Sequence, residues 1–527
     1  MESRGIATRW IRLPAILLIL FTSSAQADTW YRAESPNFRI YSNIDAPETR
    51  AHVEQLEAFK YLADLLLGNN PKDRTSASRF TIYLVDSPDH FKTVVPKIGR
   101  YVGGFYNTCI EGSHAFVFAP QSYGAQMDFG LNILLHEYSH HLMFSRMRRF
   151  YPSWYVEGFA EYLAGTRLQN GYYLVGVRQD QRAAQLTASD RWLDYDVMLD
   201  PKRFTAAVKK KQVNTFQYYA QSWITAHYML SDSTRAKALN AYFDRVARGE
   251  DGSEALKAAS GMTTSELRKE INSYRRKYSA LQVKVPELPD SPITVDRLPR
   301  ERGDYLIEAA ALRGCPDKKH GVKLLKELRA LRSKRPGEVG LLLEVSRAEL
   351  LFGDAKAARA ELESLVAKDP SSFDAHYLLG RSYLQDAIGA SPEHIENRSK
   401  ASAQFLEAYM LDKGHAPNLY YLSISMDTDG TPSKSVVNAG TAAATLAPSV
   451  PEYAMHAALV NLRAGDKSAA IRVLQPFANN PHELDYAAQV AALISELGET
   501  EDMSEAISKL EKLGLPPKKK EEDEDKG

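Results

Sequence analysis

The sequence has no excess of charge of either sign, almost no cysteine and, beyond its first residues, no long hydrophobic run. Its 527 residues include 66 basic and 66 acidic side chains, so net charge gives no reason to expect nucleic acid or an anionic membrane surface as a partner. Cys109 and Cys315 are the only cysteines, which excludes a disulfide-framework protein. These two could pair in an oxidising compartment or remain separate buried thiols, because the sequence does not give their distance.

The first 27 residues have the three-part pattern of a secretory signal peptide. Arg4, Arg9 and Arg12 precede the short apolar run Leu13–Phe21, and residues 25–27 (AQA) form a small-x-small cleavage pattern. A membrane anchor is the alternative, but a spanning helix needs about 20 apolar residues. We therefore expect a mature chain that starts near residue 28, has no transmembrane segment and is exported as a soluble periplasmic or secreted protein.

Residues 28–282 mix strands and helices, whereas the rest of the chain is helical. Three segments alternate or run apolar over the length of a strand: 38–41, 80–85 and 114–118. Helical spacing over 47–67, and over most of 127–278, then indicates an α+β domain. Residues 283–300 contain four prolines and little periodicity, so we expect an extended linker that proteases reach. The charge run within 515–527 predicts a disordered tail.

Residues 301–514 are helical and repetitive. Pro336 and Pro370 lie 34 residues apart, and Gly353-Asp354 recurs in kind as Gly465-Asp466. Around them, small residues that let two helices approach alternate with large ones that fill the space to the next pair, as in tetratricopeptide repeats. These positions are Leu342, Val345, Ala358, Leu362 and Leu365, then Leu379, Gly380, Tyr383, Ala401, Phe405 and Ala408, and later Ala457, Ala470, Leu474 and Phe477. Another helical-hairpin solenoid is the alternative. The expected fold is therefore an α+β domain followed by an all-α solenoid.

Residues 135–140 (LHEYSH) contain the pattern His-Glu-x-x-His. On a helix, positions i and i+4 share a face, so His136 and His140 can offer imidazole nitrogens to one metal ion. Glu137, one position further round the helix, would then lie beside a metal-bound water and could take its proton. Apolar residues on both sides of the pattern indicate a buried helix around a polar site.

A carboxylate follows at a suitable spacing. Glu157 comes 17 residues after His140, within the segment 154–163 (WYVEGFAEYL). A catalytic zinc usually takes three protein ligands and leaves one position for water, so two histidines and a glutamate complete the set.

His-Glu-x-x-His followed by a Trp-x-x-Glu-Gly-x-Ala helix resembles the gluzincin metalloproteases, which include thermolysin and the aminopeptidase N relatives. The closest resemblance is to the smaller peptidase MA-like domains of exported bacterial proteins. It covers residues 101–228 in motifs and 30–278 in layout. The resemblance implies a zincin-type catalytic domain and a hydrolase with Zn²⁺ as cofactor. It also implies His136, His140 and Glu157 as metal ligands, with Glu137 as general base.

The same resemblance suggests further site residues. Glu161, one turn after Glu157, is a candidate for holding a ligand imidazole, for a substitute ligand, or for an ordinary surface charge. Tyr219 falls on the position of a tyrosine that hydrogen-bonds the tetrahedral oxyanion, although it could instead be a packing aromatic like its neighbour Tyr218. His227 is an outside candidate for that role. His141 points away from the ligand face and is expected to lie in the core or behind the ligands.

Residues 112–118 (GSHAFVF) resemble the edge strand along which gluzincins bind a peptide. This gives His114, Ala115 and Phe116 as candidate substrate contacts, with an ordinary core strand as the alternative. The Gly-x-Met-Glu-Asn strand by which aminopeptidases of the clan hold a free amino terminus has no counterpart here. An endopeptidase is therefore favoured over an aminopeptidase.

The sequence thus predicts a zinc-dependent peptidase whose repeats recruit a protein substrate or another protein partner. The alternative is a catalytically weak or inactive zincin scaffold whose repeats serve protein binding or assembly in the cell envelope. A metal hydrolase acting on non-peptide bonds is a third hypothesis, because a site alone does not fix the bond that is cut.

Overall fold

Nine strands and twenty-four helices are present in the part of the chain that the computed structural model describes. The described residues are 29–68, 70, 79–96, 104–118, 125–145, 151–169, 171–188, 192–284, 292–389, 391–428, 430–478, 480, 483–500 and 502–516. The signal-peptide prediction and residues 517–527 of the predicted tail lie outside them. Across these ranges, no helix combines the length and the apolar character needed to cross a bilayer.

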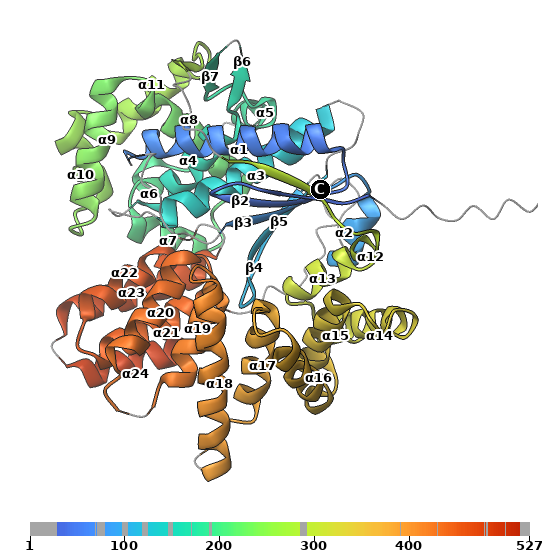
Figure 1. Cartoon of the computed structure of the whole chain (residues 1–527). Helices are drawn as coiled ribbons and strands as arrows, with labels where there is room; N and C mark the ends of the chain where they lie inside the picture. The colour runs from blue at the N-terminus through green and yellow to red at the C-terminus, as the bar shows by residue number, and fades with distance from the viewer. Residues whose placement is uncertain are drawn as a thin grey trace, which may run out of the picture.

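Two sheets and eleven helices form the first part of the chain (Figure 1). The strands are β1 Tyr31–Glu34, β2 Phe38–Ser42, β3 Phe80–Val85, β4 Gly104–Cys109, β5 Gly112–Phe118, β6 Arg167–Gln169, β7 Tyr172–Val175, β8 Leu281–Lys284 and β9 Thr294–Arg297. The helices are α1 Ala46–Leu66, α2 Pro88–Val94, α3 Ala125–Ser145, α4 Ser153–Ala164, α5 Asp180–Ala188, α6 Tyr195–Met198, α7 Pro201–Lys209, α8 Thr215–Leu230, α9 Ser233–Val246, α10 Gly252–Ser260 and α11 Thr264–Tyr274.

The larger sheet has six strands in the order β4-β5-β3-β2-β1-β9. Strands β2, β3 and β5 run parallel, and the other neighbouring pairs are antiparallel. Side chains alternate between its two faces along each strand. One face, which includes Ile40, Ile82 and Ala115, belongs to the hydrophobic core of α1, α3, α4 and α8. The smaller sheet, in the order β6-β7-β8, was not predicted from the sequence.

The opposite face of the large sheet packs against the second part of the chain. Tyr83, Val85 and Phe116 share one hydrophobic core with Leu306 and Leu341, which belong to the helical second part. The sheet domain and the solenoid are therefore not separate folding units.

The expectation of an extended linker over 283–300 is wrong for its described residues. Residues 294–297 form β9, which pairs with β1 so that Val295 lies opposite Ala33. Prolines on both sides of this four-residue strand hide its signal in the sequence. Because β9 and the shared core hold the two parts together, we do not expect proteolysis in this segment to separate them.

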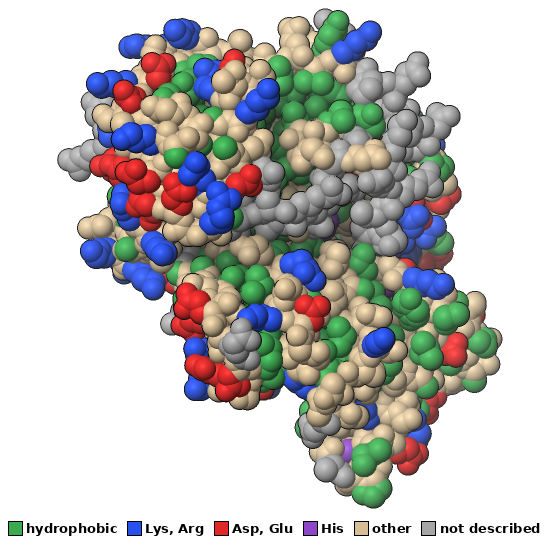
Figure 2. Space-filling view, turned by 90° about the vertical axis from the view of Figure 1, so that its left-hand side faces the viewer, with side chains coloured by type: hydrophobic (Ala, Val, Ile, Leu, Met, Phe, Trp, Pro, Cys, Tyr) green, Lys and Arg blue, Asp and Glu red, His purple; other side chains and the backbone are tan. Residues whose placement is uncertain are grey.

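Thirteen helices follow. From α13 to α24, each helix contacts the next one in the chain. They are α12 Arg300–Gly303, α13 Leu306–Arg313, α14 Lys318–Lys334, α15 Val339–Phe352, α16 Ala355–Lys368, α17 Phe373–Gln385, α18 Pro392–Leu411, α19 Ala416–Met426, α20 Lys434–Leu446, α21 Pro451–Arg463, α22 Lys467–Ala478, α23 Leu484–Glu499 and α24 Met503–Leu513. Among the predicted repeat positions, Ala358, Leu362, Ala401, Phe405 and Ala470 are fully buried or nearly so. This part of the chain is therefore helical and compatible with the predicted repeats. Side chains of both charges are interspersed over the face shown in Figure 2.

The hairpin of β4 and β5 reaches into the arc of the solenoid, with the end of β4 between α13 and α19 (Figure 1). At its tip, Glu111 forms ion pairs with Arg347 (2.9 Å) and Arg381. The Tyr453 hydroxyl donates a hydrogen bond to the Ile110 carbonyl over 2.6 Å. A disulfide joins Cys109 to Cys315, which settles the question of pairing that the sequence left open.

Candidate metal centre

Two packed helices bring the motif residues together. Helix α3 carries the His-Glu-x-x-His pattern, and α4, which follows after a short connection, packs between α3 and α8. All side chains of α4 from Trp154 to Ala164 are buried. Gly158 allows α4 and α8 to approach closely, because a Cβ atom there would collide with the main-chain carbonyl of Ser222. This contact explains the Glu-Gly pair in the motif, and it places α8 beside Glu157.

The side chains of His136, His140 and Glu157 converge. Their potential ligand atoms all lie within 4.8 Å of one another. The Nε2 atoms of the two histidines are 3.1 Å apart. The two carboxylate oxygens of Glu157 lie 3.5 Å from His136 Nε2 and 3.5 Å from His140 Nε2.

The chemistry of this donor set fits a zinc ion. Two imidazole nitrogens that face each other at hydrogen-bonding distance need a shared proton or a cation between them. Burial lowers the pKa of His140, more than the nearby charges of Glu137 and Glu161 raise it, which favours the neutral imidazole that a metal requires. The side chain of Glu157 is completely buried, and nitrogen and carboxylate donors are those that zinc takes in proteins.

Glu137 and Tyr219 are close enough for the charge of Glu137 to act on the Tyr219 hydroxyl. Tyr219 of α8 is partly buried against the core. Burial, and then the negative charges of Glu157, Glu137 and Glu161, raise the pKa of Tyr219, so that its hydroxyl stays a neutral hydrogen-bond donor. The charge of Glu137 also contributes, after burial, to a raised pKa of Tyr106 on β4, the strand against which α3 packs.

Behind the cluster, Glu161 contacts His136. Its Oε1 atom lies 3.5 Å from His136 Nδ1, on the side of the ring away from Glu157. The same oxygen accepts a hydrogen bond from the guanidinium of Arg182 on α5. Of the three alternatives for Glu161, this position matches the carboxylate that holds a ligand imidazole.

Arg182 was not singled out in the sequence. Its guanidinium lies 5.4 Å from the ring centroid of Tyr219, so it links the residue behind His136 with the candidate oxyanion donor. No local signal identifies it, since α5 is mostly polar and its partners come from α4 and α8.

Three other residues named from the sequence have partners outside the cluster: the candidate His227, and two neighbours of motif residues, Tyr218 and His141. The ring nitrogens of His227 contact the Tyr274 hydroxyl (2.8 Å) and the Gly176 carbonyl (2.9 Å), so this residue does not serve as the oxyanion donor. Tyr218 is fully buried and stacks on Phe204. His141 is half-buried and stacks on Tyr138, which belongs to the core.

The prediction that residues 112–118 form an edge strand is wrong. Strand β5 pairs with β3 on one side and β4 on the other, and Ala115 and Phe116 are buried core residues. The structure has the core-strand alternative instead. Strand β4, which the sequence did not predict, takes the outer position. His114 faces the solenoid rather than the metal cluster. Helix α3 packs against β4, so the described strand edge nearest to the cluster is that of β4.

Comparison with known proteins gives no independent assignment for this site. No protein-family model matches the sequence, and no curated protein matches it either. The case for a function therefore depends on the geometry of the site and on its motifs.

Proposed function

We propose that the protein is a zinc-dependent peptidase of the gluzincin type that acts as an endopeptidase. The observation that carries this proposal is the convergence of His136, His140 and Glu157 within 4.8 Å, with Glu137 on the same turn of α3. Zinc held by these residues would polarise the scissile carbonyl and lower the pKa of a bound water. The zincin fold and the tetratricopeptide identity of the solenoid belong to the same proposal.

The proposal gives each of the protein groups a role. Glu137 takes the proton from the attacking water and returns it to the leaving amine, since it is adjacent to the ligand His136 in the chain. The Tyr219 hydroxyl, kept neutral by its surroundings, donates to the oxyanion as charge develops on the carbonyl oxygen. Glu161, itself bound by Arg182, orients the imidazole of His136.

An extended peptide would pair with β4 rather than with β5. The outer edge of β4 has no partner strand among the described residues, and main-chain pairing gives affinity with little side-chain preference. The solenoid fixes this strand, because Asn107 donates a hydrogen bond to the Gly314 carbonyl over 2.9 Å and Cys109 is bonded to Cys315. Recruitment of a substrate or partner by other solenoid surfaces remains a prediction.

A peptide library tests the proposal. The full-length chain loaded with zinc is incubated with peptides that carry free or acetylated amino termini, and products are identified by mass spectrometry. We expect internal cleavage of both sets, and loss of cleavage in Glu137→Gln with zinc retained. Equal cleavage by this variant would refute the role of Glu137, and cleavage of free amino termini alone would refute an endopeptidase.

One observation favours the alternative of a scaffold. The inner side of the solenoid binds the chain's own hairpin through Glu111, and the sheet and the solenoid share a core. Such integration is compatible with a mainly structural role. Zinc binding without cleavage of any library peptide would support that reading over the peptidase.

A further inference from the structure

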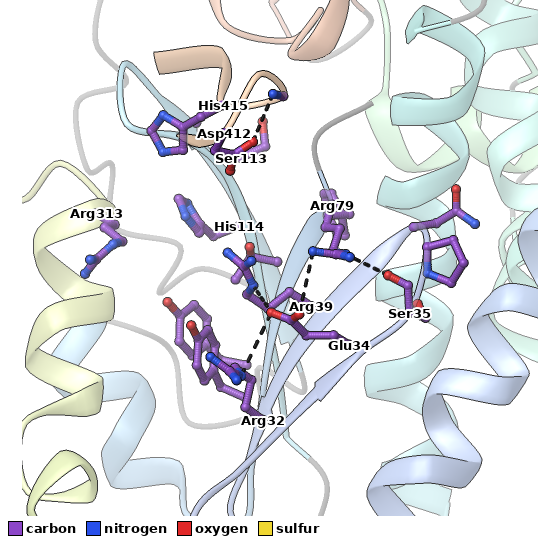
Figure 3. Close-up of a pocket in the computed structure, with 18 of the residues that line it drawn as sticks. Arg32, Glu34, Ser35, Arg39, Arg79, Ser113, His114, Arg313, Asp412 and His415 are labelled. Carbon is purple, nitrogen blue, oxygen red and sulfur yellow. Dashed lines mark hydrogen bonds and ion pairs between the residues drawn. The ribbon is translucent and has the colours of Figure 1, made fainter. Parts of the chain in front are cut away.

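A polar cavity of about 1580 Å³ lies along the large sheet and is bordered by the solenoid and by α1. Strands β1, β2, β3 and β5 form its floor, and residues of α12, α13, α15, α17 and the α18–α19 connection form its roof (Figure 3). Residues of α1, together with His141 of α3, line its remaining side. None of His136, His140 and Glu157 lines it. It is larger than the roughly 300–1,000 Å³ of typical small-molecule sites.

The floor follows from strand register. Glu34, Arg39, Thr81 and His114 are direct neighbours across four strands and point to the same face. The next row on this face, two residues further along β2, β3 and β5, is aromatic: Tyr41 stacks on Tyr83 and Tyr83 on Phe116. The aromatic row packs toward the solenoid core, whereas the polar row lies open to the cavity.

Two side chains of the polar row, His114 and Arg39, can form further hydrogen bonds. The side chain of His114 is more than nine-tenths buried, and its Nδ1 atom has no hydrogen-bond partner among the described residues. Burial, and then the positive charge of Arg313, lower the pKa of His114 to about 3, so the ring is neutral and offers one donor and one acceptor. Arg39 donates a hydrogen bond from Nε to Glu34 over 2.7 Å. Its two terminal amino groups donate no hydrogen bond to a side chain within the described part of the chain.

The lining is rich in arginine. Seven arginines and one lysine line the cavity, against six carboxylates. On the floor, Arg32, Arg39 and Arg79 surround the single carboxylate of Glu34 at 3.9, 2.7 and 3.6 Å. Arg313 faces them from the roof (Figure 3). Arginine at this density, in a chain without net charge, suits the planar two-point recognition of carboxylates.

We propose that this cavity is a second binding site, which takes an acidic peptide segment by placing a carboxylate between Arg39 and His114. The volume favours a peptide over a small anion, and the Tyr41 and Tyr83 rings lie next to the polar row for apolar parts of the ligand. The inference rests on the cavity alone and does not require the metal cluster to be catalytic.

Binding of a fluorescent octaglutamate peptide to the full-length chain in 0.15 M salt, measured by anisotropy, tests the proposal. Octalysine and inorganic phosphate serve as comparison ligands. We expect Arg39→Ala to weaken octaglutamate binding about tenfold or more, and His114→Phe, which keeps the ring, about threefold or more. Arg329→Ala is the matched control, because Arg329 also donates from Nε to a glutamate, over 2.6 Å, but lies outside the cavity.

Unchanged affinity in both cavity variants, or an equal loss in Arg329→Ala, would overturn the site. Phosphate binding that depends on Arg39, without binding of octaglutamate, would overturn the assignment to an acidic peptide. The peptide is checked for cleavage by mass spectrometry, and each variant by its melting temperature. If Arg39→Ala melts early, Arg39→Gln, which keeps a donor toward Glu34, is used with the same expected loss.

Discussion

Replacing Glu111 by glutamine should destabilise the contact between the β4–β5 hairpin and the solenoid by about 3–5 kcal/mol. The side chain of Glu111 is 3% exposed and forms ion pairs with Arg347 and Arg381, whose side chains are also buried. Glutamine keeps the volume but removes the charge, which leaves two buried guanidinium groups with less compensation. Removing one member of such a group costs far more than the net contribution of the pair.

The first assay is urea unfolding of the full-length chain. The second is hydrogen exchange at the amides of β4 and β5 under native conditions. Arg381→Met alone and Glu111→Gln with Arg381→Met complete a double-mutant cycle. The double variant should lose less unfolding free energy than the two single variants lose together, because it removes one uncompensated charge together with its partner. A loss below about 1 kcal/mol for Glu111→Gln, or strict additivity, would refute the reasoning.

The effect should also depend on pH. Burial alone would raise the pKa of Glu111, but the charges of Arg381, Arg347 and Arg313 outweigh it and hold the pKa below the ordinary value of 4.5. A carboxyl group with a lowered folded-state pKa stabilises the fold above its unfolded pKa and loses this contribution as pH falls through the folded value. The difference in unfolding free energy between wild type and Glu111→Gln should therefore be largest at neutral pH and shrink below about pH 4.5.

Three further predictions concern the disulfide, the metal cluster and the core shared by the sheet and the solenoid. Cys109→Ser with Cys315→Ser should lower stability by about 2–5 kcal/mol, because the disulfide closes a loop of 206 residues; a melting temperature equal to that of the oxidised wild type would contradict this. Glu161→Gln should weaken zinc binding about 10–100-fold, measured by competition with a chelator, whereas Glu254→Gln on α10 should not; equal affinities would mean that Glu161 does not orient His136. Deleting residues 301–527 should abolish cleavage of short peptides and of folded proteins alike, because it exposes Tyr83, Val85 and Phe116 of the shared core; intact peptide cleavage by the truncated chain would show that the sheet domain folds alone.

The features that the sequence predicted depend on local periodicity. The helical placement of His136 and His140 follows from their i, i+4 spacing, and the burial of α4 follows from its apolar composition. The solenoid was predicted because each repeat buries the same positions, as at Ala358 and Ala401. The family resemblance and the zinc cofactor are still predictions.

The features that it missed depend on contacts between distant segments. Strand β9 has four residues, and only its pairing with β1 makes it a strand. Strand β4 (GFYNTC) lacks clean alternation, so the outer strand was assigned to β5. Arg182 acquires its role through Glu161, and Arg39 and His114 line the same cavity only through the register of three strands. Neither arrangement leaves a pattern within one segment.

We propose that His136, His140 and Glu157 form a metal centre. Zinc content per chain, measured by mass spectrometry on the purified full-length protein, tests it most directly. We expect about one zinc in wild type and in His141→Phe, which changes another histidine of the same helix, and none in His136→Ala with His140→Ala. Undiminished zinc in the double alanine variant, or no zinc in a folded wild type, would contradict it and would leave the cluster as histidine–carboxylate pairs.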